Sequence, residues 1–307
     1  MEQRIIVIAG STCSGKTEVG IKLAEELDAE IISADSRQIY KYLDIGTAKP
    51  TKEELEKIKH HFISELEPDE DYDVSKFEND ALKRIGDIYQ RGKIPLVVGG
   101  SGLYIRALVE GIVETPDKDE EFRKELLFEK EKYGNEFLYE KLKKIDPASA
   151  GKMHPSYWKR VIRALEVYHL TGKKLSQFHI EQDKNRKYNF KEYVLNWQRD
   201  ILYKNIEKRV DKMIELSLVE ETKNILELGY SKKLNSLNTV GYKEIIAYLD
   251  GEISLERAIE LIKRNTRRFA KRQLTWFRAD HKTTWVDIDK ENNLDKISEK
   301  ILNASKL

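Results

Sequence analysis

The sequence predicts an α/β fold: a parallel sheet with crossover helices, as in the core of P-loop nucleoside triphosphatases, together with a helical insertion and long C-terminal helices. Three observations predict it. In the first third of the 307 residues, short apolar runs alternate with helical patterns. A glycine-rich loop follows the first apolar run and opens the first helical pattern. From residue 114 to about residue 190 the chain is highly charged and helical in pattern, which indicates an insertion without strands.

The predicted elements are a strand over residues 4–9, a helix over 17–27, a strand over 30–34, a helix around 77–88 and a strand over 94–98. Helical periodicity returns over residues 210–228, a long helix is expected over 254–278, and a closing strand over 284–286. We expect two domains. Residues 1–113 and 191–307 form the P-loop core with its C-terminal helices, and residues 114–190 form the helical insertion.

Composition excludes several classes of protein. Cys13 is the only cysteine, so the chain forms no intrachain disulfide and no multi-cysteine zinc or iron–sulfur site. The longest apolar runs are far shorter than the ~20 residues that span a bilayer, and the N-terminus shows no leader pattern. We therefore expect a cytoplasmic protein that acts as a monomer and has no membrane partner.

Charge is abundant and balanced, with 55 Lys and Arg against 54 Asp and Glu. Two stretches depart from this balance: residues 151–190 hold nine basic and three acidic residues, and residues 257–282 hold nine basic and two acidic. Basic patches of this density, interleaved with aromatic residues, suit a polyanionic partner such as a nucleic acid. A solvated helix face has a similar composition, so charge alone leaves both interpretations open.

The glycine-rich loop matches the pattern G-x-x-x-x-G-K-[ST] in full. Its residues are Gly10, Ser11, Thr12, Cys13, Ser14, Gly15, Lys16 and Thr17. In such a loop the backbone amides converge on phosphate oxygens, the lysine neutralises their charge, and the final hydroxyl can hold Mg²⁺. The motif therefore predicts a diphosphate or triphosphate ligand, with Thr17 as the metal ligand, but it does not distinguish between the two.

Polar residues also follow the second and third predicted strands. Asp35 comes directly after residues 30–34, and Ser101 lies in a turn with Gly99, Gly100 and Gly102 after residues 94–98. The carboxyl ends of parallel strands form the ligand-binding edge of a sheet. Asp35 is a candidate general base, with a helix cap or a Mg²⁺ partner as alternatives. Ser101 is a candidate hydrogen-bonding partner of the ligand, with a simple tight turn as the alternative.

The long C-terminal helix has basic residues at spacings of three and four. These are Arg264, Arg267, Arg268, Lys271 and Arg272. Apolar residues fall on another face of the same helix. A basic stripe on an anchored helix suits contact with a phosphodiester backbone.

Taken together, these motifs resemble those of the bacterial tRNA dimethylallyltransferases, over nearly the whole chain and in the same order. The matching stretches are residues 10–17, 33–40 (SADSRQIY), 45–50 (IGTAKP), 99–104, 163–168 (RALEVY) and 270–277 (AKRQLTWF). Several of them are specific to that family, unlike a P-loop alone. Small departures occur: Ser11 stands where the family usually has Pro, and Ser101 where it usually has Thr. The chain also lacks the C-terminal zinc finger of eukaryotic relatives.

The resemblance implies transfer of a dimethylallyl group from its diphosphate to the exocyclic amine of the adenosine just 3′ of the tRNA anticodon, with Mg²⁺ as cofactor. It implies catalytic roles for Asp35 as base, for Lys16 and for Ser101, and a diphosphate contact for Arg209. The residues it places on the tRNA anticodon stem-loop are Asp35, Ser36, Arg37, Gln38, Ser101, Arg123, Lys159, Arg160, Val161, Ile162 and Arg163. To these the basic stripe adds Arg264, Arg268 and Arg272.

Other functions use the same motifs. A small-molecule P-loop kinase would bind ATP in the same loop and use Asp35 to activate a hydroxyl group. A prenyltransferase acting on free adenine nucleotides and a nucleotide-dependent RNA-binding protein without group transfer are further alternatives. The two basic patches, which are larger than a metabolite requires, favour the tRNA-modifying enzyme.

Overall fold

The computed structural model describes residues 4–113, 115–181, 187–280, 282–289 and 293–305. The chain divides into a core unit, Met1–Glu110 with Arg186–Leu307, and a helical unit, Gly111–Asn185. The domain limits expected from the sequence were residues 114 and 190. The second of these falls inside strand β5 (Asn189–Trp197), which belongs to the core unit.

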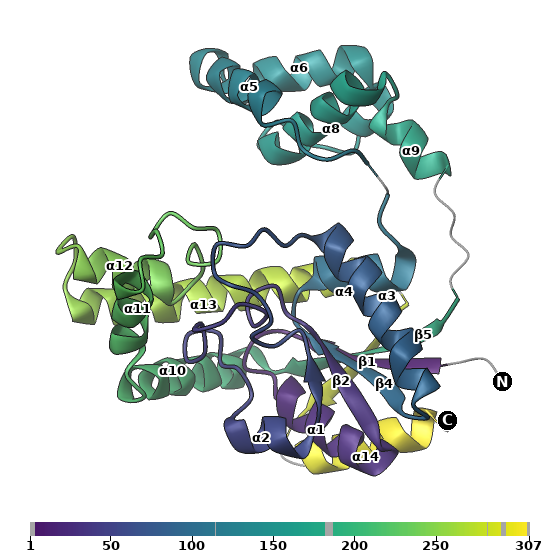
Figure 1. Ribbon diagram of the computed structural model, residues 1–307, viewed down its shortest axis with the longest axis vertical. Coiled ribbons are helices and arrows are strands. Elements are labelled where there is room, and N and C mark those ends of the chain that lie inside the picture. Colours follow the sequence, from purple (N-terminus) through teal and green to yellow (C-terminus); the bar gives the residue numbers. More distant parts are fainter. Residues whose placement is uncertain (1–3, 114, 182–186, 281, 290–292, 306–307) are drawn as a thin grey trace. The chain divides into compact units, whose positions relative to one another are not determined.

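The core unit is built on a parallel sheet, which in the described residues has six strands in the order β3-β2-β4-β1-β5-β6. The other strands are β1 (Arg4–Gly10), β2 (Ala29–Ala34), β3 (His60–His61), β4 (Ile94–Gly99) and β6 (Thr284–Ile288). Gly99 of β4 pairs with Ala9 on one side and with Ala34 on the other. Strands β1, β2 and β4 (Figure 1) therefore end together. The P-loop, Asp35 and the glycine-rich turn follow these strands, so they leave the sheet at one edge.

Helices cover both faces of this sheet because apolar side chains of β1 alternate between them. Ile6 and Ile8 pack with α1 (Lys16–Leu27) and α14 (Leu294–Ser305), which lie next to each other in Figure 1. Ile5 and Val7 belong to the larger cluster on the other face. That cluster includes residues of α3 (Val74–Gln90), α4 (Gly102–Glu110), α10 (Arg199–Glu215), α11 (Leu218–Glu227), α12 (Tyr242–Leu249) and α13 (Leu255–Arg278). A short helix, α2 (Lys52–Lys57), precedes β3.

The predicted parallel sheet, its first crossover helices and the long C-terminal helix are confirmed. The elements of the core unit that were not predicted are the strands β3 and β5 and the helices α2, α4, α12 and α14. Strand β5 was missed because Lys191 and Glu192 interrupt its apolar residues, although the strand lies between β1 and β6 in the sheet. None of the helices in the described ranges is long and apolar enough to cross a membrane.

The helical unit has a hydrophobic core of its own. Its helices are α5 (Glu120–Tyr133), α6 (Asn135–Ile145), α7 (Pro147–Ala150), α8 (Trp158–Thr171) and α9 (Leu175–Glu181). The core consists of Leu126, Leu138, Leu142, Ala150, Val161, Ile162, Ala164 and Leu165. Helix α8 supplies half of these side chains, so the other helices of the unit pack around it.

Candidate active site

The loop between β1 and α1 has a conformation suited to binding phosphate. Gly10 has a φ of 151° and Gly15 a φ of 87°, a backbone region that favours glycine. A Cβ atom on Gly10 would lie 2.9 Å from the carbonyl oxygen of Leu195 on β5. Ser11 and Ser14 are buried, and Thr12, Cys13, Gly15, Lys16 and Thr17 are partly exposed. The buried Ser14 hydroxyl has no partner among the described residues, as expected of a group that awaits a ligand at a helix N-terminus.

Two cations lie at this loop. Lys16 Nζ donates to the carbonyl oxygen of Ser11 at 2.5 Å, and Arg209 Nη1, from α10, donates to Thr12 Oγ1 at 3.3 Å. Burial of the ammonium group, and to a smaller extent the positive charge of Arg209, lower the pKa of Lys16 to about 8. An anion bound here would pair with both cations and offset their mutual repulsion. The electrostatics of the loop therefore favour an anionic ligand.

Gln273 of α13 joins the two glycine-rich segments. Its Oε1 accepts a hydrogen bond from the Thr12 amide at 2.9 Å, and its Nε2 donates to the carbonyl oxygen of Gly100 at 2.8 Å. A Cβ atom on Gly100 would lie 2.6 Å from that nitrogen, so the contact requires glycine at this position. Sequence reasoning did not predict this role. Two signals were present: Gln273 is an uncharged polar residue after the basic Lys271 and Arg272, and it lies in the family-like stretch 270–277.

Asp35 follows β2 and caps the turn after it. Its Oδ1 accepts hydrogen bonds from the amides of Arg37 at 2.9 Å and Gln38 at 3.4 Å. The Ser36 amide donates to Ser101 Oγ at 3.0 Å, which fixes the start of the same turn. One oxygen of Asp35 thus has the capping role considered as an alternative, whereas Oδ2 accepts no hydrogen bond from any described residue. Oδ2 and the hydroxyl hydrogen of Ser101 remain available to a ligand.

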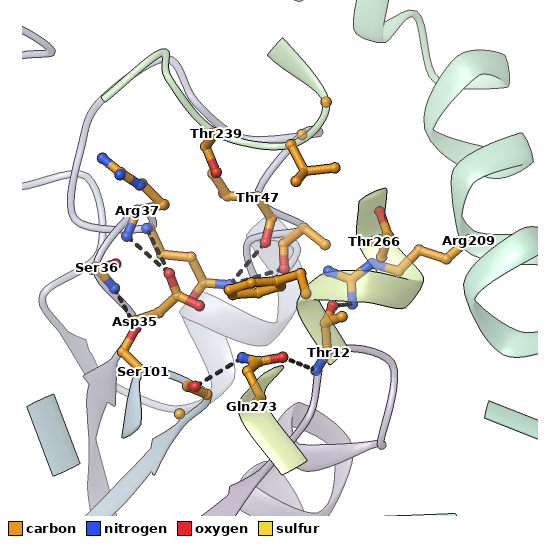
Figure 2. A pocket seen from close by; sticks show the side chains of 18 of the residues that line it. Thr12, Asp35, Ser36, Arg37, Thr47, Ser101, Arg209, Thr239, Thr266 and Gln273 are labelled. Carbon is orange, nitrogen blue, oxygen red and sulfur yellow. Dashed lines mark hydrogen bonds between the residues drawn. The ribbon is translucent and has the colours of Figure 1, made fainter. Parts of the chain in front are cut away.

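These groups line one pocket of about 360 Å³. Figure 2 shows Thr12 and Arg209 on one side of it and Asp35 to Arg37 on the other, with Gln273 between them. The apolar part of the wall includes Ile206, Val210, Met213, Val240, Ile262 and Phe269. The pocket can therefore hold a phosphorylated ligand that has an apolar part, and it places a carboxylate opposite the phosphate loop.

Thr17 lies in the same lining and is the candidate Mg²⁺ ligand. Across the described ranges, no group of three or more His, Cys, Asp or Glu side chains could hold a metal ion. Mg²⁺ usually keeps several waters and binds through one or two protein oxygens together with phosphate oxygens. The residues present fit a Mg²⁺ ion that binds together with a phosphorylated ligand, and they do not form a preformed metal cage.

Comparison with known proteins decides the family. The sequence model described as IPP transferase matches residues 38–280 of the chain. The chain belongs to the IPP transferase family. It is 48% identical to the tRNA dimethylallyltransferase of Carboxydothermus hydrogenoformans, over 98% of this chain and 97% of that protein. It is 47% identical to the tRNA dimethylallyltransferase of Pelotomaculum thermopropionicum, over 98% and 96%.

Solved structures with the same fold include two family members. The full-length tRNA isopentenylpyrophosphate transferase of Bacillus halodurans is 39% identical and superposes with a TM-score of 0.72, covering 99% of this chain and 97% of that one. A eukaryotic dimethylallyltransferase acting on tRNA is 32% identical and superposes with a TM-score of 0.85. The match covers 99% of this chain and 79% of the eukaryotic chain. The IPP transferase fold therefore extends over almost the whole chain.

Fewer basic residues of α13 are exposed and unpaired in the structure than the sequence predicted. Arg268, Lys271 and Arg272 are exposed on α13. Arg267 donates to Glu207 of α10 at 3.0 Å, so its charge is already paired. Arg264 is only partly exposed, and its Nε is buried. The stripe available to a polyanion therefore consists of Arg268, Lys271 and Arg272, and the last of these also lines the pocket.

Two arginines that the family resemblance placed on tRNA are engaged within the helical unit. Arg123 donates to both carboxylate oxygens of Glu166, which is fully buried, and Arg163 donates to the same carboxylate. Arg163 also donates to Thr115 Oγ1 and to the carbonyl oxygen of Pro116, both at 2.7 Å. In this structure the two guanidinium groups hold the start of α5 and the Thr115–Pro116 segment against α8.

The predicted run from Lys159 to Arg163 needs a correction. Val161 is 0% exposed and Ile162 is 4% exposed, because both side chains belong to the core of the helical unit. Their side chains therefore cannot contact RNA on the surface. Lys159 and Arg160 are exposed, with their cationic groups over the rings of Trp158 and Tyr157. Lys159 and Arg160 thus remain candidates for tRNA contact.

Proposed function

We propose that this protein transfers a dimethylallyl group from dimethylallyl diphosphate to the exocyclic amine of the adenosine just 3′ of the tRNA anticodon, with release of diphosphate. The observation that carries the proposal is the pocket in which the P-loop, Arg209 and Asp35 meet beside an apolar wall. Membership of the IPP transferase family supports the proposal, and the similarity to one relative extends over 98% of this chain. The relatives that are 47% and 48% identical to this chain are named tRNA dimethylallyltransferases, which agrees with transfer of a dimethylallyl group to tRNA.

The donor would bind with its diphosphate on the P-loop. Lys16, Arg209 and the amides at the start of α1 would pair with the phosphate oxygens. Val210, Met213 and Ile262 lie in the same pocket and suit the five-carbon group. When the bond between C1 and oxygen breaks, its electron pair leaves with the diphosphate. The two cations stabilise that charge most strongly where it is greatest, which lowers the barrier.

The acceptor would enter from the side of Asp35. The adenosine has to leave the base stack, at a cost of a few kcal/mol, before its amine can reach the pocket. The amine nitrogen then forms a bond to C1 of the donor and gives up one proton. Asp35 Oδ2, which accepts no hydrogen bond from any described residue, would take that proton. Ser101 would hold the turn that carries Asp35 through its hydrogen bond from the Ser36 amide.

Mg²⁺ fits this proposal as a cofactor held by the Thr17 hydroxyl together with diphosphate oxygens. When bound, it supplies further charge stabilisation for the diphosphate as the allylic bond breaks. Lys16, Arg209 and the amides at the start of α1 hold the donor in the absence of Mg²⁺.

Labelled dimethylallyl diphosphate tests the function directly. We expect label in tRNA only when enzyme, donor and tRNA are all present, and none in AMP offered as acceptor. Transfer to AMP would identify a prenyltransferase of free nucleotides. Transfer of phosphate from labelled ATP to a small hydroxyl compound, without prenylation, would identify a kinase. Binding of tRNA with no transfer in any arm would leave an RNA-binding protein.

The pH dependence of donor binding follows from Lys16. Its pKa of about 8 means that the ammonium form predominates below that value and is lost above it. Diphosphate pairs with the charged form, so the dissociation constant should rise by up to about tenfold per pH unit above pH 8. Calorimetric titration with dimethylallyl diphosphate from about pH 7.5 to about pH 9.5 measures this. The matched variant Lys16→Arg stays charged and should give a flat profile; an equal rise in both proteins would refute the assignment.

Salt dependence tests the stripe on α13. The variant Arg268→Ala/Arg272→Ala should bind tRNA more weakly and flatten the slope of log affinity against log salt by about 1.4 to 1.8, because each lost phosphate contact contributes about 0.7 to 0.9. Lys83→Ala, on the exposed side of α3, is the control with one charge removed elsewhere. Filter binding at several salt concentrations gives both values. An unchanged slope would show that the stripe is a solvated helix face.

A further inference from the structure

One carboxylate outside the pocket holds a segment of the pocket wall. Glu221 of α11 accepts hydrogen bonds from three successive backbone amides: Asp44 at 3.1 Å, Ile45 at 2.7 Å and Gly46 at 3.1 Å. Tyr242 of α12 donates its hydroxyl to the same carboxylate at 2.6 Å. Gly46 lies in the pocket lining, whereas Glu221 does not. The carboxylate therefore fills a nest of amides from behind the wall.

The segment held in this way, residues 44–48, is connected to Asp35. Gln38 Nε2 donates to the carbonyl oxygens of Thr47 at 3.3 Å and Ala48 at 3.1 Å. The backbone amide of Gln38 in turn donates to Asp35 Oδ1. The turn that carries Asp35 is thus fixed by Ser101 at its start and by the 44–48 segment at its end.

The backbone in and next to this segment is strained. Ala48 has a φ of 48°, and Tyr42, just before the segment, has a φ of 65°. Left-handed conformations of residues other than glycine persist only where surrounding contacts impose them. Lys49 supplies contacts on the far side, donating to the carbonyl oxygen of Tyr40 and to Ser64 Oγ. On the near side, the amides of residues 44–46 depend on Glu221.

We propose that Glu221 is a positioning residue for the transfer reaction: through the 44–48 segment and Gln38 it sets the place of Asp35 opposite the phosphate loop. This inference rests on the proposed function. It implies that α11, which supplies no residue to the pocket lining, determines how well Asp35 is aligned with the incoming amine. A displacement of about 1 Å at a reacting group can lower a rate by about 10²-fold.

Glu221→Gln is the variant that tests it. The glutamine oxygen can replace only one carboxylate oxygen, which serves either the amides of Asp44 and Ile45 or the Gly46 amide and the Tyr242 hydroxyl. The NH₂ group takes the other place, so half of the four hydrogen bonds are lost. We expect a single-turnover rate lower by about 10- to 100-fold, with the dissociation constant of dimethylallyl diphosphate within about threefold of wild type. The matched control is Glu220→Gln, which removes the same charge one residue earlier on the exposed side of α11 and should leave the rate unchanged.

A second comparison separates positioning from general damage. In an Asp35→Asn background the base is already absent, so Glu221→Gln should lower the rate by less than about threefold further. Losses that multiply in the double variant would show that Glu221 does not act through Asp35, and the proposal would be wrong. A Glu221→Gln variant as fast as wild type would have the same consequence.

Hydrogen exchange gives a measurement that does not depend on the reaction. The amides of residues 44–46 should exchange at least about tenfold faster in Glu221→Gln than in wild type, with α1 unaffected. If wild type transfers no prenyl group, the proposed function fails, whereas unchanged exchange at residues 44–46 overturns the role of Glu221. Should Glu221→Gln not fold, Tyr242→Phe removes one hydrogen bond to the carboxylate; a wild-type rate in that variant would also overturn the proposal.

Discussion

The Asp35→Asn variant should lose prenyl transfer by ~10²–10⁴-fold, the usual effect of removing a general base. The change preserves the local structure, because the asparagine Oδ1 can still accept from the amides of Arg37 and Gln38. What is lost is the ability of the other carboxylate oxygen to take a proton. Single-turnover experiments with labelled donor measure the loss, and tRNA affinity should change only a few-fold.

Three outcomes distinguish the roles considered for Asp35. If Asp35 is the base, the Asp35→Asn variant transfers slowly but binds the donor normally at any Mg²⁺ concentration. A lost Mg²⁺ ligand weakens donor binding and is partly rescued by excess Mg²⁺. A cap alone would be replaced well by asparagine, leaving turnover nearly intact. Asp69→Asn, at an exposed position, controls for the loss of one negative charge. Retained turnover in Asp35→Asn ends the assignment of Asp35 as base.

Lys16→Ala should lower transfer by about 10²–10³-fold, because one group that stabilises the departing diphosphate is removed. Binding of tRNA should stay within a few-fold of wild type, since the exposed cations of α13 lie outside the phosphate loop. Arg268→Ala/Lys271→Ala should show the opposite pattern, with weakened tRNA binding and normal donor binding, because both residues are exposed and neither lines the pocket. Parallel calorimetry for the donor and filter binding for tRNA measure the two properties.

Lys208→Ala is the control for Lys16→Ala, because it removes a positive charge from the exposed side of α10 next to Arg209. It should change neither property. If a folded Lys16→Ala variant loses tRNA binding as severely as transfer, then the phosphate loop itself grips RNA, and the separation of the two binding functions is wrong.

The parts of the site that follow from local sequence were predictable. The loop from Gly10 to Thr17 is encoded by consecutive residues, so its conformation and its place after a strand could be read directly. The approach of Asp35 and Ser101 to that loop was also predictable, because parallel strands expose their carboxyl ends at one edge. Register confirms it, since β1, β2 and β4 end together.

The parts that depend on distant helices were not predictable from the sequence. Gln273 contacts Thr12 from α13, and Glu221 contacts Asp44 from α11. No periodicity or motif records which of many polar side chains on a helix reaches a given amide. The same limit affected Val161 and Ile162: a contiguous run of residues was assigned to tRNA, although the helical period of α8 turns these two side chains into the core.

The position of β5 beside β1 has a consequence for the order in which the chain folds. Gly10 at the end of β1 pairs with Leu195 of β5, and the whole helical unit lies between them in the sequence. Closing so long a loop is entropically costly and slow. A helical unit with its own core can fold first and bring its ends together, and each halving of the effective loop lowers the closure cost by about 0.6 kcal/mol.

The Gln273 contact to Thr12 comes later still, since α13 is synthesised after all of the sheet except its last strand. During translation the phosphate loop therefore emerges among the first residues but gains its last support among the final ones. Nascent chains carry an incomplete pocket for most of their synthesis, and the site is complete only when α13 packs against the phosphate loop.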